Sequence, residues 1–160
     1  MPNCNCGSRR PRNEVRNSNC AMCDIEQGIR LIDDGVDNVN AGINSALAGN
    51  FCECNRQITQ GINNMETGLF SLETGLGVVE NGLSCSRRRQ IDDGVCDIRR
   101  GISDVEEGLC EICRGNVNRG ISLCNQGLGN VEEGLNNIED ALNLNNTLNN
   151  CNNNCNCNCV

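Results

Sequence analysis

The central part of the chain is built on a seven-residue pattern of apolar and polar positions. Apolar residues recur at alternating spacings of three and four, as at Ile25, Ile29, Ile32, Val36 and Val39. This spacing keeps one stripe of an α-helix apolar, whereas a strand would need a spacing of two. The pattern predicts four amphipathic helices, at roughly 22–48, 56–82, 90–114 and 117–148.

A glycine opens nearly every seven-residue unit, which follows the formula Gly-apolar-x-x-apolar-x-x, as in GINNMET and GLFSLET. Glycine weakens a helix by roughly 0.8 to 1 kcal/mol relative to alanine, so it must supply either a positive φ at a turn or a small size beside the apolar stripe. Ala141 stands where a further glycine is due, and alanine resists a positive φ. Small size is therefore favoured, and we expect close helix packing at twelve glycines: Gly28, Gly35, Gly42, Gly61, Gly68, Gly75, Gly94, Gly101, Gly108, Gly120, Gly127 and Gly134.

A longer repeat is superimposed on the seven-residue one. Ile25, Ile58 and Ile91 open successive blocks at equal intervals, and the connector FCECNRQI resembles SCSRRRQI. A duplicated helix-plus-turn unit predicts an all-α fold, namely an antiparallel bundle of four glycine-heptad helices. The predicted organisation is an arm rich in Cys, Asn and Arg at 1–21, a four-helix repeat domain at 22–148, and a Cys- and Asn-rich tail at 149–160.

The bundle is expected to be only marginally stable when it is isolated. Its apolar stripe is narrow, the rest of its surface is Asn, Asp and Glu, and the only aromatic residues are Phe51 and Phe70. Small cores of weak helix formers leave little net stability. Neighbouring molecules or covalent cross-links are therefore expected to support it.

The composition excludes several functions. There is no His and no Tyr, so the commonest general base and the commonest nitrogen ligand for metals are missing. We expect neither an enzyme nor a cofactor. The net charge of -8 argues against nucleic-acid binding, and the short basic run at Arg87, Arg88 and Arg89 is typical of a solvated loop. No segment approaches the length needed to cross a bilayer, so membrane insertion is not expected.

The many cysteines of the chain are unexpected for a protein that is made in a cytosol. The N-terminus has no apolar stretch that resembles a signal peptide, which predicts synthesis in a cytosol. The chain nevertheless has 15 cysteines, and reducing compartments rarely hold disulfide frameworks. Either the thiols bind metal, or the chain meets an oxidant later without being secreted. The odd number leaves at least one thiol free or available to another molecule.

The positions of the cysteines suggest cross-linking between molecules. With glycine as position zero, the apolar stripe is positions one and four, and Cys124 is the one mid-chain cysteine on it, where we expect a buried thiol. Other surface thiols are expected at Cys20, Cys23, Cys96, Cys110 and Cys113. The candidates for intermolecular disulfides lie in the tails and turns: Cys4, Cys6, Cys151, Cys155, Cys157 and Cys159, followed by Cys52, Cys54 and Cys85.

A thiolate protein that binds or stores Cu(I) or Zn(II) is the alternative. C-x-C and C-x-x-C are spacings that suit these ions, but CAMC and CEIC lack a second pair at zinc-ribbon spacing. The chain also resembles, at a distance, copper-storing four-helix bundles, whose interiors are lined by thiols; here the interior is Ile, Leu and Val. Thioredoxin-type catalysis would require C-x-x-C between a strand and a helix, and no strand is predicted.

The tails NCNC and CNNNCNCNC, together with the missing secretion signal, resemble the cysteine-rich structural proteins of bacterial endospore surfaces: coat, exosporium and appendage subunits. The resemblance implies synthesis in a mother-cell cytosol and oxidation when that cell lyses. Appendage subunits of one class are β-sandwiches, whereas this chain is predicted to be helical. We therefore expect a self-assembling structural protein whose partner is itself, forming a fibre or sheet through disulfides and helix packing, with a final site that is extracellular or on a spore surface.

Overall fold

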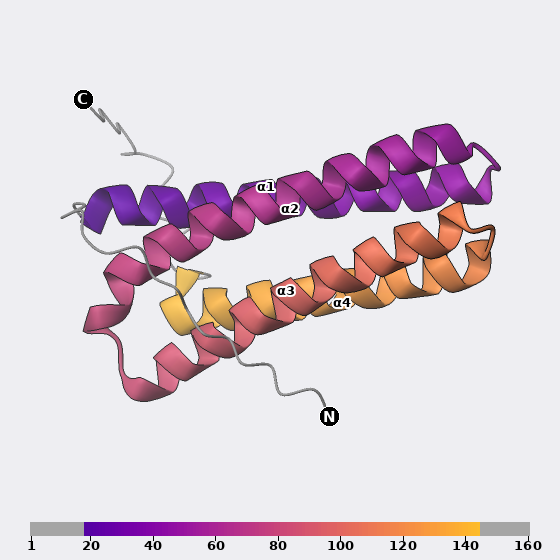
Figure 1. Cartoon of the computed structure of the whole chain (residues 1–160). Helices are drawn as coiled ribbons and strands as arrows, with labels where there is room; N and C mark the ends of the chain where they lie inside the picture. The colour runs from indigo at the N-terminus through magenta and orange to yellow at the C-terminus, as the bar shows by residue number, and fades with distance from the viewer. Residues whose placement is uncertain (1–17, 145–160) are drawn as a thin grey trace.

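The computed structural model describes residues 18–144, which form an all-α bundle. Its long helices are α1 (Ser18–Leu47), α2 (Phe51–Val79), α3 (Cys85–Cys113) and α4 (Val117–Leu142), and a short 3-10 helix, η1 (Glu80–Gly82), follows α2. Successive helices run in opposite directions, so α1 and α2 form one hairpin and α3 and α4 form a second (Figure 1). No strand occurs within this range. The predicted antiparallel four-helix bundle is confirmed.

Helices α2 and α3 begin earlier than the heptads predict, because each has a capping residue upstream. The Asn50 side chain accepts a hydrogen bond of 3.3 Å from the backbone N–H of Glu53, and Ser84 accepts one of 3.4 Å from the N–H of Arg87. These caps satisfy donors that a helix start leaves free. The segments expected to be connectors are therefore the first turns of the helices, and Arg87 to Arg89 lie on α3 instead of in a loop.

The outer limits of the bundle also differ from the prediction. Helix α1 already begins at Ser18, inside the expected arm, and α4 ends at Leu142, where Asn143 takes a left-handed conformation with φ 56°. That conformation stops a helix. The rest of the arm, the predicted helical residues after 144 and the tail at 149–160 lie outside the described residues.

The two hairpins close through turns of the same kind. Gly49 and Gly115 have φ values of 77° and 90°, which glycine adopts without steric cost. In the first turn the N–H of Asn50 donates to the carbonyl of Ser45 at 2.8 Å, and the second turn repeats this bond between Asn116 and Glu111 at 2.9 Å. The glycine N–H supplies the second bond of each turn, from Gly49 to the carbonyl of Ala46 and from Gly115 to that of Ile112, both at 3.0 Å. These paired bonds end a helix when the residue after it adopts a positive φ, so glycine is required at both positions for its backbone conformation.

Within each hairpin, the helices touch through positions zero and four of the heptad. A Cβ added to any of the twelve predicted glycines would lie within 3.1 Å of a backbone atom on the facing helix. Position-four residues such as Ile32, Val39 and Ile98 are fully buried beside these glycines. The close approach of the helices that the small glycines predict is thus present. The contact within a hairpin, however, is formed by positions zero and four, whereas the sequence pattern had suggested positions one and four.

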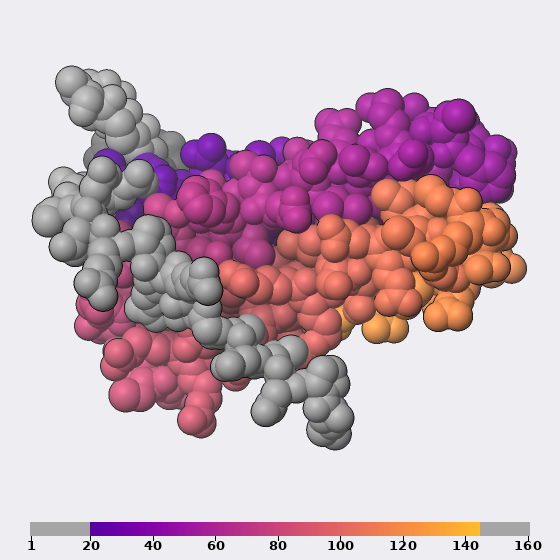
Figure 2. Space-filling view, viewed as in Figure 1, coloured from indigo at the N-terminus to yellow at the C-terminus, as the bar shows by residue number. Residues whose placement is uncertain are grey.

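Position one forms a separate layer of the core. Residues there, such as Ile62, Leu69, Ile102 and Leu128, are less than a tenth exposed. The hairpins pack α2 against α3 and α1 against α4, and Figure 2 shows them meeting along the bundle. We infer that position one fills the space between hairpins. A heptad with an aliphatic residue at position one therefore makes two contacts, one within its hairpin and one to the other hairpin.

Candidate functional site: cysteines at the two ends of the bundle

The antiparallel order of the helices sends the described cysteines mainly to the two ends of the bundle. One end, which we call the turn end, holds the turns at 48–50 and 114–116; the opposite end holds the start of α1 and the connection between α2 and α3 (Figure 1). At the opposite end lie Cys20, Cys23 and Cys85. At or near the turn end lie Cys52, Cys54, Cys110 and Cys113.

Four of the described cysteines are exposed free thiols: Cys52, Cys85, Cys110 and Cys113. Cys85 is the first residue of α3, and the Arg88 guanidinium donates to its Sγ at 3.6 Å. Cys113 is the last residue of the same helix. Cys20, Cys23 and Cys96 are half-buried, which makes them less accessible than the surface positions expected for them. Cys4, Cys6, Cys151, Cys155, Cys157 and Cys159 lie outside the described residues.

Cys54 is buried, so its selection as an accessible cross-linking residue is wrong for the folded bundle. It occupies position zero of the first heptad of α2, one unit before Gly61, and its carbonyl oxygen would lie 3.2 Å from a Cβ added to Gly42. Burial raises the pKa of the Cys54 thiol, and the nearby Cys113 raises it further. The burial of residue 54 could have been predicted from the heptad register. That register places it at position zero, in the contact between the two helices of a hairpin, which we call the seam, although it is not a glycine.

Cys124 is the buried seam thiol that its heptad position predicts. It is fully buried at position four, and its Sγ lies 3.8 Å from the carbonyl oxygen of Val105. Burial raises the pKa of this thiol to about 12, with a smaller contribution from Cys54. At neutral pH Cys124 is a protonated, apolar side chain that fills the core.

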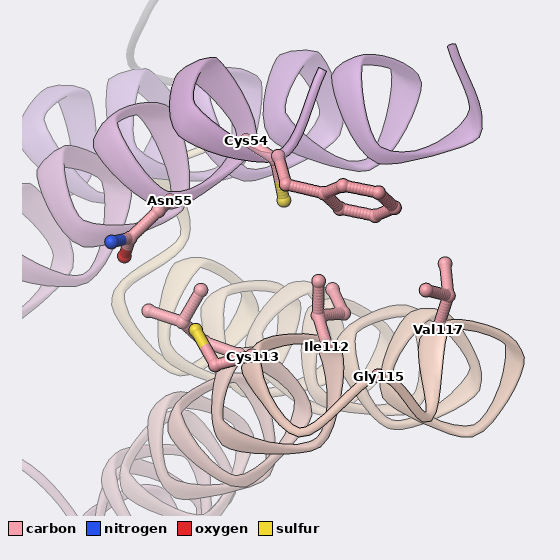
Figure 3. A pocket seen from close by; sticks show the side chains of 8 residues that line it. Cys54, Asn55, Ile112, Cys113, Gly115 and Val117 are labelled. Atoms are coloured by element: carbon pink, nitrogen blue, oxygen red, sulfur yellow. The ribbon is translucent and has the colours of Figure 1, made fainter. Parts of the chain in front are cut away.

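An apolar hollow of about 270 Å³ opens between the two hairpins at the turn end. Figure 3 shows Cys54 and Asn55 reaching toward it from α2, with Ile112, Cys113 and Val117 on the other side. The half-exposed Phe51 and Leu109 complete its wall. This hollow was not foreseen from the sequence.

The hollow exists because the heptad pattern is broken at Asn55. Residue 55 is position one of its heptad, and the same position in the following units of α2 is Ile62, Leu69 and Leu76, all buried. An asparagine there is exposed and does not supply the aliphatic volume that would fill the layer between the hairpins. Asn55 could have been found from the sequence by aligning the first heptad of α2 with the others.

A second hollow, of about 300 Å³, lies between α1 and α4 and is acidic. Its wall includes Asp33, Glu132 and Glu139. Partial burial raises the pKa of Asp33, and its neighbours Asp37 and Asp34 add to the effect. Burial also raises the pKa of Glu139, and Asp33 across the gap contributes. Like charges therefore oppose each other where the two hairpins meet on this side.

The side chain of Glu111 lies at the centre of a group of polar contacts that connect the end of α3 with the second turn. Its carboxylate is nearly fully buried and accepts hydrogen bonds from Arg114 at 2.8 Å and from the Asn116 side chain at 2.9 Å. Arg119 lies 3.7 Å from the same carboxylate. The hydrogen bonds from Asn116 and Arg114 hold the pKa of Glu111 below its ordinary value.

Comparisons with protein-family models, with curated proteins and with solved structures find no match. None of the helices in the described part of the chain combines the length and apolar character needed to cross a membrane. Among residues 18–144, no group of three or more Cys, Asp or Glu side chains is arranged to hold a metal ion.

Proposed function

We propose that this protein is a self-assembling structural subunit whose copies are joined by disulfides into a fibre or sheet. The observation that carries the proposal is that exposed thiols stand at both ends of one rigid helix. Cys85 and Cys113 are the first and last residues of α3, and both are exposed. A subunit that can be linked at two opposite ends can be extended without limit.

The separation of these thiols forces any bond between the two ends to be intermolecular. Helix α3 has 29 residues, so its ends lie about 42 Å apart at 1.5 Å per residue. A disulfide requires Cα atoms less than about 7 Å apart. Cys85 and Cys113 therefore cannot pair with each other within one folded bundle, and a disulfide between them would have to join two molecules.

The construction of the bundle suits a structural subunit that needs covalent support. The glycines bring the backbones of facing helices into contact, and the core beside them is aliphatic, because Phe51 and Phe70 are both exposed. A disulfide stabilises by about 2 to 4 kcal/mol, which is a large fraction of the stability of a small domain. Leu47, Phe51 and Phe70 are 66%, 50% and 68% exposed, and they offer apolar contact area to neighbouring copies.

The place of assembly that best accommodates these features is the surface of a bacterial spore or cell. A chain made in a reducing cytosol keeps its thiols free, and oxidation begins once the cell that made it lyses. The support for this location is the resemblance of the cysteine-rich tails to endospore surface proteins.

Non-reducing electrophoresis of the full chain, before and after oxidation by a low-molecular-weight disulfide, tests the proposed function. We expect a ladder of multimers that collapses to monomer when reductant and denaturant are added. Replacing both Cys85 and Cys113 by Ser should shorten the ladder, whereas the matched substitution of the buried thiol, Cys124→Val, should leave it unchanged. A monomer that carries several Cu(I) or Zn(II) ions in native mass spectrometry would contradict the proposal and support the metal-binding alternative.

A further inference from the structure

We propose that the hollow at the turn end receives the C-terminal segment, residues 145–160, of a neighbouring copy, and that Cys151 of that segment forms a disulfide with Cys113. This inference rests on the proposed function and specifies how one subunit is joined to the next. It assigns a docking role to a hollow whose walls come from both hairpins.

The hollow has the character of a docking site for an uncharged, partly apolar segment. Its wall includes Phe51, Leu109, Ile112 and Val117, and the polar group within it is the uncharged side chain of Asn55. Phe51 is half exposed, so apolar area is left that a second chain can cover.

The C-terminal segment matches this character. Residues 145–160 contain no charged side chain, and a leucine, Leu148, precedes Cys151 by three positions. Burying such a segment requires no side-chain charge to leave water, which would otherwise be costly. The N-terminal segment is a poorer match because it carries Arg9, Arg10, Arg12 and Arg16.

The reach of Cys151 makes the bond to Cys113 intermolecular. Leu144, the last described residue, follows α4 at the end opposite the hollow, and α4 has 26 residues, so about 39 Å of helix separates them. Cys151 follows Leu144 by seven residues, which span at most about 23 to 25 Å when fully extended. Cys151 therefore cannot enter the hollow of its own bundle. A second copy stacked end to end would place its turn end next to Leu144 of the first copy, within the reach of Cys151.

The two thiols of the hollow differ in their availability for the bond. Cys113 is exposed, whereas Cys54 is fully buried behind it in the seam. Disulfide exchange proceeds by attack of a thiolate, which requires access and loss of the proton. Cys113 is therefore the partner of Cys151, and Cys54 stays reduced in the core.

The oxidant is a low-molecular-weight disulfide. The Cys113 thiolate attacks it, forms a mixed disulfide and releases one small thiolate. The Cys151 thiolate of the neighbour then attacks the Cys113 sulfur and releases the second small thiolate. The two protein thiols lose two protons and two electrons, and the small disulfide is reduced to two thiols.

The test is to oxidise a mixture of nitrogen-15-labelled and unlabelled full-length chains and to identify cross-linked peptides by mass spectrometry. We expect a Cys113–Cys151 peptide pair that combines one labelled and one unlabelled partner. Asn55→Leu fills the hollow and should raise the stability of the reduced monomer while this cross-link is lost. The matched control Asn63→Leu adds a leucine at an exposed position of the same helix, and it should leave the cross-link unchanged.

The outcomes separate this inference from the proposed function. A ladder of multimers in which Cys113–Cys151 is absent, or in which Asn55→Leu leaves its yield unchanged, overturns the docking inference while the structural function stands. A pair found only within unlabelled or only within labelled chains would show an intramolecular bond and would also overturn it. If oxidation produces no multimers at all, both proposals fall.

Discussion

Gly28 and Gly68 each place a backbone carbonyl where the other would carry a side chain. A Cβ on Gly28 would lie 2.7 Å from the carbonyl oxygen of Gly68, and a Cβ on Gly68 would lie 2.6 Å from that of Gly28. The hydrogen that occupies this direction on each Cα therefore points at the facing carbonyl. Such Cα–H···O contacts contribute about 0.5 to 1 kcal/mol each. This is close to the cost of about 0.8 to 1 kcal/mol by which glycine, relative to alanine, weakens a helix.

Two glycines on α4, only two residues apart, should respond in opposite directions to alanine. In Gly127→Ala the new Cβ would meet the carbonyl oxygen of Gly101 and would lie 2.8 Å from Cγ2 of Val105, so we expect a loss of about 1 to 3 kcal/mol in the free energy of unfolding. In Gly129→Ala the Cβ meets no atom within 4 Å, so the helix should gain about 0.8 to 1 kcal/mol. Urea titration of the reduced protein measures both. Equal effects would contradict the assignment of the seam to position zero.

The heptad pattern was sufficient to predict the helices, their antiparallel order and the close packing of the glycines. Apolar spacing of three and four has only one regular structure that keeps it on one face, and Ala141 argued for small size over turn geometry. The pattern could not locate the start of α2, because Asn50 acts through a local hydrogen bond that periodicity does not record. It also could not separate the contact within a hairpin from the contact between hairpins, since both appear as one apolar stripe.

The buried thiol of Cys124 should make the bundle sensitive to alkaline pH. The folded protein holds the thiol proton up to about pH 12, whereas an unfolded chain releases it near its ordinary pKa of 9.0. Unfolding therefore releases a proton between these values, and stability should fall as the pH rises from about 9 to 12. Cys124→Val, which places an aliphatic residue at position four as in Val131, should flatten this fall.

The matched comparison for Cys124→Val is Cys110→Ala, which removes an exposed thiol from the same bundle. Thermal unfolding of both variants and of the parent under reducing conditions, followed from pH 8 to pH 11, gives the answer. An alkaline fall in Cys124→Val as steep as in the parent would show that the buried thiol is not its source.

Glu111→Gln should weaken the second turn. The carboxylate of Glu111 accepts hydrogen bonds from Arg114 and Asn116, and these bonds lower its pKa. Because the folded pKa lies below the ordinary value of 4.5, this contribution is present above pH 4.5 and is lost as the pH falls through the lowered value. We expect Glu111→Gln to be less stable than the parent at pH 7, with the difference shrinking in acid. The exposed Glu133→Gln serves as the control in thermal melts.

Glu139→Gln should make the bundle more stable at pH 7, the opposite of the effect of Glu111→Gln. Glu139 faces Asp33 across the acidic hollow. Burial and the like charge of Asp33 raise the pKa of Glu139, while burial and the neighbouring Asp37 and Asp34 raise that of Asp33. A raised carboxyl pKa means that stability is lost as the pH rises from the ordinary value through the raised one. Removing the charge should therefore stabilise the bundle at pH 7 by roughly 0.5 kcal/mol, since both groups are partly solvated and screened. The gain, measured by urea titration, should disappear as the pH falls below the ordinary pKa values of 3.8 and 4.5, because the two carboxyls then take up protons in the folded and the unfolded chain alike.

The burial of some cysteines can be predicted from the heptad pattern, whereas that of others depends on how the helices pack. Cys124 falls on an apolar position, so the sequence was enough to predict its burial. Cys54 and Asn55 depend on register: the first replaces a glycine in the seam, and the second replaces an aliphatic residue between the hairpins. Their consequences became visible only when the facing hairpin was in place, because a hollow is a property of two surfaces.

The alternation of glycine and carbonyl along each hairpin also determines how the bundle would carry a mechanical load. Every seventh residue fixes the axial register of the two helices in a hairpin. A small lengthwise shift of one helix would press a Cβ atom against a carbonyl oxygen of the other. Pulling the two helices of a hairpin apart lengthwise must then break several such steps together instead of one after another. A filament assembled end to end from these hairpins would consequently be stiff under tension and would fail abruptly, at its covalent joints or by cooperative rupture of a whole seam.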